Sequence, residues 1–309
     1  MFSKKIKSKK CNSGFTIVEL SIVALVIGLI TSSVIVGKDL VRQSEIRSAI
    51  SQIEQYQAAV KTFNIKYNAF PGDMADATKY WPELDDGKGN GCAGYKCHRP
   101  NKQVHQCDGT PTIKHTCNGN GDGVINCCGD FGNQITEIFL FWQHLSNAGL
   151  IIGGNNGGYN GRAGPIRHDA EIGDNVPKTK LPGGGIAILE YETHEMPGFG
   201  DHFPKSSRHD FVLGSDPTEF YDNKAEQEFW QFVEAPLLTS IEALSVDEKL
   251  DDGLPGKGTV QTRRRSNHGT NKYECTNSAA GSNPVQDAED ARYNPTPNGI
   301  ECFLLFRMS

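Results

Sequence analysis

The sequence predicts an α+β protein: a long N-terminal helix, apolar first and amphipathic later, packed on a head with an antiparallel sheet. Three observations lead to this prediction. Residues 15–37 are almost wholly apolar, helical spacing of apolar residues continues to Tyr67, and short strand-like runs are confined to the C-terminal half. Residues 85–133 are rich in Gly, Asn and Cys and show little periodicity, so we expect them to form an insertion in the head.

The charge of the chain is unevenly distributed. Residues 1–14 hold five lysines and no acid, and the chain as a whole has a net charge of −6, which leaves −11 for the remainder. An acidic body gives no electrostatic basis for binding nucleic acid. The basic leader is typical of a segment that flanks a membrane span on the cytoplasmic side.

Residues 15–37 have the length and composition of a membrane-spanning helix. They contain 23 residues with Glu19 as the only ionisable side chain, and about 20 apolar residues suffice to cross a bilayer. No small-residue signal-peptidase site follows the apolar run, so we expect this segment to remain in the mature protein. The sequence therefore predicts a single pass through the cytoplasmic membrane, with residues 68–309 as an extracytoplasmic globular head.

The helical pattern continues beyond the membrane span. We expect one helix over residues 15–67, ending near Lys66, which at 1.5 Å per residue is roughly 75 Å long and exceeds a membrane's width. Its second half needs the head as a packing partner, and Pro71 ends it because proline biases Phe70 toward an extended backbone. The apolar positions recur at steps of three and four: Ile46, Ile50, Ile53, Tyr56, Val60, Phe63 and Tyr67.

The head is expected to contain further helices and strands. Thr239 or Ser240 would cap the predicted helix over residues 239–249, with Glu242 in its first turn. The predicted helices are residues 135–148 and 239–249, and the predicted strands are residues 185–191, 210–213 and 300–307.

The heptapeptide Gly14-Phe15-Thr16-Ile17-Val18-Glu19-Leu20, after a basic leader, closely resembles the prepilin cleavage and methylation signature of type IV pilins and type II secretion pseudopilins. The resemblance implies that a prepilin peptidase cuts between Gly14 and Phe15 and methylates the new amine of Phe15. Glu19 would then be the fifth mature residue. The Pro-Gly-Asp turn at residues 67–74 is similar to the turn that ends the long helix in many pilin-like proteins. Residues 142–151 and 251–255 resemble segments of a large-headed branch of the family.

This resemblance implies a structural subunit that acts by assembly. Its partners would be the prepilin peptidase, other pilin or pseudopilin subunits that pack on the N-terminal helix, an inner-membrane assembly platform and the cytoplasmic membrane. A carboxylate in hydrocarbon is costly and normally paired, so Glu19 of one subunit would neutralise the Phe15 amine of its neighbour. The alternative is an uncleaved anchor in which Glu19 only complements the helix dipole.

Several filament roles stay open. The mature chain of 295 residues, the full 309 less the 14 of the leader, is large for the bulk subunit of a fibre, which favours a minor or tip-proximal pilin or a pseudopilin. The alternative from another class is a membrane-tethered extracellular binding or adhesion module that forms no filament.

The cysteine content predicts disulfides. Cys11 lies in the leader, and the other eight form an even set in an oxidising compartment, which allows up to four disulfides. Cys275 and Cys302 stand apart from the others and are expected to pair, as a C-terminal disulfide loop is common in similar proteins. The pairing inside residues 92–128 stays open. A zinc cluster with neighbouring histidines is the alternative, although close Cys-x-x-Cys pairs are lacking. The histidines concerned are His98, His105 and His115.

Residues 118–129 match the front half of an EF-hand-type calcium loop, which makes calcium a possible cofactor. Position 12 is Gly129 rather than the usual Glu, so Asp130 or Glu137 would have to complete the shell. The alternative is a turn-rich loop held by disulfides. Oxygen-bearing side chains occupy positions 1, 3 and 5, namely Asn118, Asn120 and Asp122.

Nothing in the sequence nominates an enzyme. The chain has no Gly-x-Ser-x-Gly, no His-Glu-x-x-His and no phosphate-binding Gly-x-x-x-x-Gly-Lys-Ser/Thr motif. His144 lies in an apolar, aromatic run and is interpreted as a packed histidine. The run Arg263-Arg264-Arg265 is interpreted as a solvated loop.

Overall fold

A computed structural model describes most of the chain in two compact units. One unit extends to Arg47, and the other, the head unit, is Ser48–Ser309. The two units are described separately below. The structure describes residues 15–82, 97–98, 106–107, 116–125, 137–153, 159, 170–190, 209–216, 233–262, 274–277, 288–295 and 299–308.

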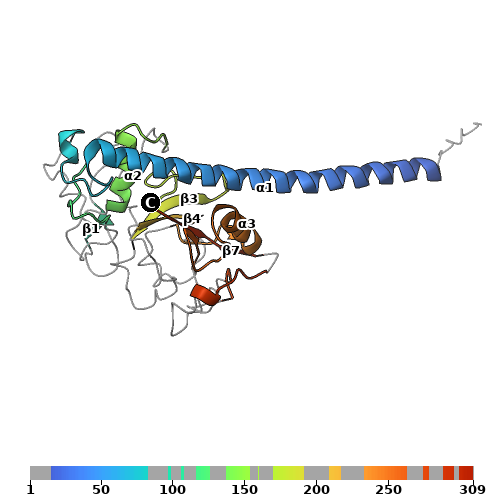
Figure 1. The fold of residues 1–309 in the computed structure, drawn as a ribbon. Helices are drawn as coiled ribbons and strands as arrows, with labels where there is room; N and C mark the ends of the chain where they lie inside the picture. Colours follow the sequence, from blue (N-terminus) through green and yellow to red (C-terminus); the bar gives the residue numbers. More distant parts are fainter. Residues whose placement is uncertain are drawn as a thin grey trace, which may run out of the picture. The chain divides into compact units, whose positions relative to one another are not determined.

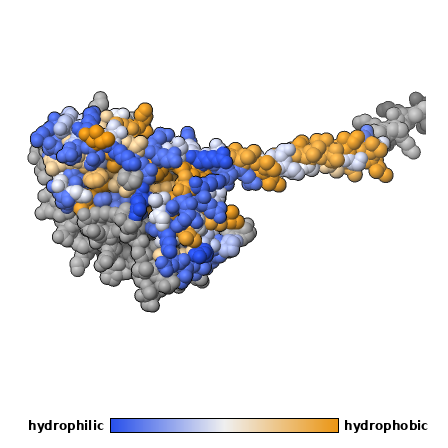
Figure 2. All heavy atoms as spheres, in the orientation of Figure 1, coloured by the Kyte–Doolittle hydropathy of each residue, from blue (hydrophilic) through white to orange (hydrophobic). Residues whose placement is uncertain are grey.

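Helix α1 (Ile17–Tyr67) is continuous over 51 residues, which confirms the predicted long N-terminal helix. In the N-terminal unit its apolar side chains are exposed, and Figure 2 shows this stretch of the helix as mostly hydrophobic. Thr31, Ser32 and Ser33 turn their hydroxyls back to helix carbonyls three or four residues earlier, so these polar groups need no outside partner. Among the described residues, α1 is the one helix long and apolar enough to cross a membrane.

The C-terminal part of α1 belongs to the head unit and packs there through one face. Of the positions that the amphipathic pattern predicted here, Ile53, Tyr56, Val60 and Phe63 are buried at three- and four-residue steps. Ile50 and Tyr67 are half-buried, and Ala49, which was not predicted, is buried instead. The helix is followed by the Pro-Gly-Asp turn at residues 71–73 and a short 3-10 helix, η1 (Ala77–Lys79).

The main sheet of the head unit is antiparallel, with strand order β3-β4-β8-β6. Two shorter sheets pair β5 with β7 and β1 with β2. The bounds are β1 Cys97–His98, β2 Gln106–Cys107, β3 Gly184–Glu190, β4 His209–Ser215, β5 Leu238–Thr239, β6 Val260–Gln261, β7 Ile300–Cys302 and β8 Leu304–Arg307.

The single C-terminal strand predicted over residues 300–307 is two strands. Residue Phe303, which is buried, separates β7 from β8. Strand β7 pairs with β5, whereas β8 pairs with β4 and β6, so the chain passes from one sheet to another at Phe303. Because side chains alternate between faces along an unbroken strand, a change of sheet needs such a break.

Helices α2 (Glu137–Asn147) and α3 (Ser240–Leu250) of the head unit lie at the predicted places. In Figure 1, α2 lies next to the C-terminal part of α1, and α3 lies near β7. The ring of Trp142 on α2 is 5.0 Å from Tyr56 of α1 and 6.1 Å from Phe211 of β4, centroid to centroid. Helix α2 therefore bridges the long helix and the sheet. Thr239 caps α3 in a reciprocal capping box with Glu242.

The predicted disulfide between Cys275 and Cys302 is present. Both cysteines are buried, and the bond joins strand β7 to the segment that contains Cys275. That segment also bridges to Tyr293 through Thr276. The disulfide therefore ties the C-terminal segments to the small β5–β7 sheet.

Candidate functional site

The start of α1 forms a capping box around Glu19. The Glu19 carboxylate accepts hydrogen bonds from the backbone N–H and the hydroxyl of Thr16, each at 2.8 Å. In return, the backbone N–H of Glu19 donates to the Thr16 hydroxyl at 3.2 Å. Thr16 therefore has the N-cap role and Glu19 the third position, the same reciprocal arrangement as at α3.

This geometry gives Glu19 local partners within one chain. Phe15, directly before the cap, is 89% exposed, and Gly14 lies outside the described residues. A carboxylate at the first turn of a helix also complements the helix dipole. Glu19 thus has a local structural role, and any contact with another subunit would come in addition to that role.

A second cluster joins the Pro-Gly-Asp turn to the Asn-Gly-rich loop. The Asp73 carboxylate accepts hydrogen bonds from the backbone N–H groups of Asp122 and Gly123, both at 3.0 Å. Two further bonds join the backbones, from Gly121 N–H to the Asp73 carbonyl at 2.9 Å and from Gly119 N–H to the Met74 carbonyl at 2.8 Å. We call residues 71–74 with residues 116–125 the turn–loop junction.

Glycine is required where the two backbones of the junction touch. A Cβ on Gly119 would lie 2.3 Å from the Gly72 carbonyl oxygen and 2.4 Å from the Asp73 carbonyl carbon. Gly72 has φ of 89°, and its Cβ would lie 2.5 Å from the Glu137 carbonyl oxygen. Both positions exclude a side chain, because the atoms in the way are backbone.

His144 holds the same junction from α2. The Gly72 N–H donates to Nδ1 at 2.9 Å, so the other ring nitrogen, Nε2, carries the proton and donates to the Cys117 carbonyl at 3.1 Å. The ring stacks on Phe63 and Trp81. Burial lowers the pKa of His144 from 6.5 to about 4, and the bond to Cys117 opposes this only in part. His144 is thus a packed, neutral histidine, as the sequence predicted.

The predicted calcium ligands lie in this junction and have backbone partners. The Asn118 side-chain oxygen accepts from Thr78 N–H, the Asn120 oxygen from Asp122 N–H, and one Asp122 oxygen from Val124 N–H. These hydrogen bonds explain the conformation of the Asn-Gly-rich loop without a bound cation. Calcium at this loop stays a prediction.

Of the residues predicted to complete the calcium shell, Glu137 does reach the loop. Its carboxylate accepts from Asn120 N–H at 2.8 Å, whereas Gly129 and Asp130 lie outside the described residues. Sequence reasoning missed Asp73, whose carboxylate binds the loop from a distance of about 50 residues along the chain. Burial raises the pKa of Asp73 above its usual value. The signal for its role was the acid directly after Pro-Gly, a turn position from which a carboxylate can reach nearby N–H groups.

A group of acids at the end of α3 is the other place where described carboxylates converge. Single oxygens of Asp247, Asp251 and Asp252 all lie within 4.8 Å of one another, which is the donor type that a hard cation such as Ca²⁺ accepts. The same carboxylates already bind the backbone N–H groups of the following turn. Asp247 also accepts from the Tyr293 hydroxyl at 2.9 Å. Burial raises the pKa of Asp247 to about 7.

The cysteine-rich segment is described only in part. Cys117 is buried and disulfide-bonded, and the backbones of Cys97 and Cys107 pair in register between β1 and β2. The remaining residues of the disulfide and zinc predictions, and the Arg263–Arg265 run, lie outside the described residues. These are Cys92, His105, His115, Cys127 and Cys128.

Comparison of the chain with models of protein families, with curated proteins and with solved structures gives no match.

Proposed function

We propose that this protein is a pilin-like structural subunit of a type IV pilus or a type II secretion pseudopilus. The observation that carries the proposal is the Gly14-Phe15 motif with Glu19 at the start of a helix of 51 residues. The helix has an exposed apolar first half and a second half that packs in the head unit. A helix that is apolar on all sides requires burial, either in lipid or among other helices.

The proposed mechanism is assembly. Prepilin peptidase removes residues 1–14 and methylates the amine of Phe15, which stays a cation. In the cytoplasmic membrane the apolar stretch faces lipid, and in the filament it faces the same stretch of neighbouring subunits. Apolar helices in hydrocarbon gain by close packing and by polar contacts between helices. Glu19 of one subunit would then neutralise the Phe15 amine of the next and set the register.

The capping box makes this mechanism testable with matched variants, because Glu19 has two separable roles. Glu19→Gln keeps a side-chain oxygen for the Thr16 N–H and removes the negative charge. Thr16→Ala keeps the charge and removes one partner of the box. Glu19→Ala removes both roles.

We expect all three variants to insert in the membrane and to be cleaved. Thr16→Ala should enter sheared filaments at close to the wild-type level, since a lost cap costs about 1 kcal/mol of local helix stability. Glu19→Gln and Glu19→Ala should be absent from that fraction. Quantitative immunoblotting of the sheared and membrane fractions measures both amounts.

Incorporation of Glu19→Gln at the wild-type level would contradict the charge-neutralisation mechanism and leave capping as the role of Glu19. A wild-type protein that is cleaved but found in no filament would favour the tethered binding or adhesion module instead. The prepilin peptidase, sister subunits and an assembly platform are the partners of the proposed function, and the head lies outside the cytoplasm.

A further inference from the structure

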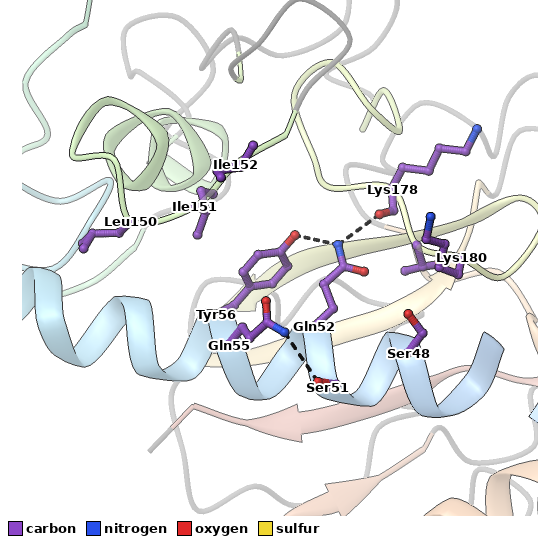
Figure 3. A pocket seen from close by; sticks show the side chains of 11 residues that line it. Ser48, Ser51, Gln52, Gln55, Tyr56, Leu150, Ile151, Ile152, Lys178 and Lys180 are labelled. Atoms are coloured by element: carbon purple, nitrogen blue, oxygen red, sulfur yellow. Dashed lines mark hydrogen bonds between the residues drawn. The ribbon is translucent and has the colours of Figure 1, made fainter. Parts of the chain in front are cut away.

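The head unit has a groove between α1 and two loops (Figure 3). Its volume is about 860 Å³, within the range of about 300–1,000 Å³ that is usual for ligand sites. One wall is a row of polar side chains on α1, the second is the apolar segment Leu150–Ile152, and the third is residues 178–180. We call it the α1 groove. Its helix wall consists of Ser48, Ser51, Gln52, Gln55 and Tyr56.

The α1 groove is a positively charged site on a protein whose net charge is negative. Lys178 and Lys180 line it, and no acidic side chain is among its lining residues. Both lysines are exposed, and within the described part of the chain neither ammonium has an ion-pair partner. The chain beyond the leader carries a net charge of −11. Two such heads repel each other at contact distances, which are shorter than the screening length of about 8 Å at physiological salt.

The two lysines are held in a defined geometry. Thr179 between them is buried, and its N–H donates to the Gly184 carbonyl of β3 at 2.9 Å. Lys178 bridges to Gly185 in antiparallel fashion. In extended backbone, residues two apart lie on one face at a separation of about 6–7 Å. Figure 3 shows Lys178 and Lys180 next to each other on one side of the groove.

The helix wall of the α1 groove is about as long as a short extended peptide. From Ser48 to Gln55 the helix rises about 10 Å, which is the length of about three residues of extended chain. Gln52 is fixed in the wall because its amide nitrogen donates to the Tyr56 hydroxyl at 2.6 Å and to the Lys178 carbonyl at 3.0 Å. Amides and hydroxyls at such spacing can pair with a peptide backbone. Opposite them, Ile152 is 98% exposed and offers an apolar contact.

We propose that the α1 groove binds an extended acidic peptide segment of a neighbouring subunit. Carboxylates at alternate positions of that segment contact Lys178 and Lys180, its backbone pairs with the amide and hydroxyl groups of α1, and an apolar side chain packs on Ile152. This inference rests on the proposed function, since the neighbour is a member of the same filament. Peptide binding in the α1 groove would attract two heads that otherwise repel each other through their negative net charge.

The test is photo-crosslinking from the groove in the full-length protein, expressed in its own cells. Ile152 is replaced by a benzophenone amino acid, and the crosslinked peptide is identified by mass spectrometry. Lys178→Glu with Lys180→Glu reverses the charge, and Lys178→Arg with Lys180→Arg keeps it. Lys61→Glu with Lys249→Glu changes the net charge equally at exposed sites that do not line the groove.

We expect a crosslink to a segment of another subunit with acids two positions apart. The product should fall at least about fivefold in the charge-reversed groove variant, since two exposed ion pairs together contribute on the order of 1 kcal/mol and reversal adds repulsion. It should stay near the wild-type level in the arginine variant and in the control. Retention of the Cys275–Cys302 disulfide, read by non-reducing peptide mapping, shows that each variant is folded.

A crosslink to lipid alone, to a segment without acids, or of unchanged yield after charge reversal would overturn the inference. The proposed function is tested separately in the same cells by the Phe15 terminus and the presence of the protein in sheared filaments. A processed, filament-bound protein whose crosslinks ignore the two lysines refutes the groove inference alone. An unprocessed protein refutes the proposed function.

Discussion

Replacing His144 by Gln removes a buried imidazole from the turn–loop junction and leaves a side chain that does not titrate. In the wild-type protein the ring is fully buried, accepts from the Gly72 N–H and donates to the Cys117 carbonyl. Glutamine carries both polar atoms on its terminal carbon, so it cannot place an acceptor and a donor where Nδ1 and Nε2 lie and cannot satisfy both groups at once. One buried group without a partner costs about 1–3 kcal/mol, and we expect the variant to be less stable than wild type by that amount at neutral pH.

The pH dependence of the free energy of unfolding separates the contribution of the His144 imidazole from that of the other groups. The pKa of His144 is about 4 in the folded protein, against the ordinary value of 6.5, which applies to the unfolded chain. As pH falls between these two values, the unfolded chain therefore binds a proton that the folded protein does not bind. The stabilisation that the neutral His144 gives the folded protein is fully present above pH 6.5 and is lost as pH falls from 6.5 to 4. Between pH 7.5 and pH 4.5 the loss amounts to about 2–3 kcal/mol.

The assay is guanidinium unfolding of the full-length protein in detergent, followed by near-ultraviolet circular dichroism at the two pH values. The pKa values of Asp73 and Asp247 are raised, so these acids favour the folded state as pH falls and oppose the histidine. They are present in both proteins, and the difference between wild type and His144→Gln removes their contribution. We expect the stability gap between the two proteins to shrink by about 2–3 kcal/mol from pH 7.5 to pH 4.5.

A gap that stays constant over this range would refute the reasoning, because it would mean that His144 takes up its proton equally in the folded and unfolded states. A gap that widens toward low pH would place the folded pKa above the unfolded one, opposite to the burial argument.

Three further predictions concern the head unit, and each is measured by thermal unfolding. Asp73→Ala leaves the N–H groups of the loop without their acceptor and should destabilise by about 2–3 kcal/mol; an unchanged melting temperature would contradict the role of this carboxylate. Gly119→Ala should destabilise by about 3 kcal/mol or more because backbone blocks its Cβ, whereas Gly123→Ala meets no atom within 4 Å and should cost only about 1–2 kcal/mol for its positive φ. Equal losses at the two glycines would rule out the close backbone approach. Asp247→Asn should gain stability relative to wild type as pH rises from 4 to 8, since a carboxyl with raised pKa becomes unfavourable to the folded state once it ionises; a flat difference would show that Asp247 titrates normally.

The sequence was sufficient for the elements that have a strong local signal. Helix α1 has an uninterrupted helical pattern up to Pro71, and α3 has a capping box readable from Thr239 and Glu242. Strands β5 and β6 have two residues each, too few for a period of two to appear, and they were not predicted. The break at Phe303 was also missed, because a run of apolar residues looks the same whether it stays in one sheet or changes sheets.

The candidate sites show the same division. The motif around Glu19 is contiguous, so its residues and their local chemistry could be named in advance. The turn–loop junction depends on Asp73 meeting a loop about 50 residues away, and the α1 groove combines three separate segments of the chain. For the Asn-Gly-rich loop the sequence left a calcium site and a turn-rich loop both open, because its oxygen spacing is the same whether those oxygens hold calcium or backbone N–H groups.

The most direct test of the account is the intact mass of the protein purified from sheared filaments of its native host. We expect a chain that lacks residues 1–14, begins at Phe15 and carries one methyl group on its terminal amine. Protein that still begins at Met1 would contradict it, because the cation proposed to pair with Glu19 would then never be formed.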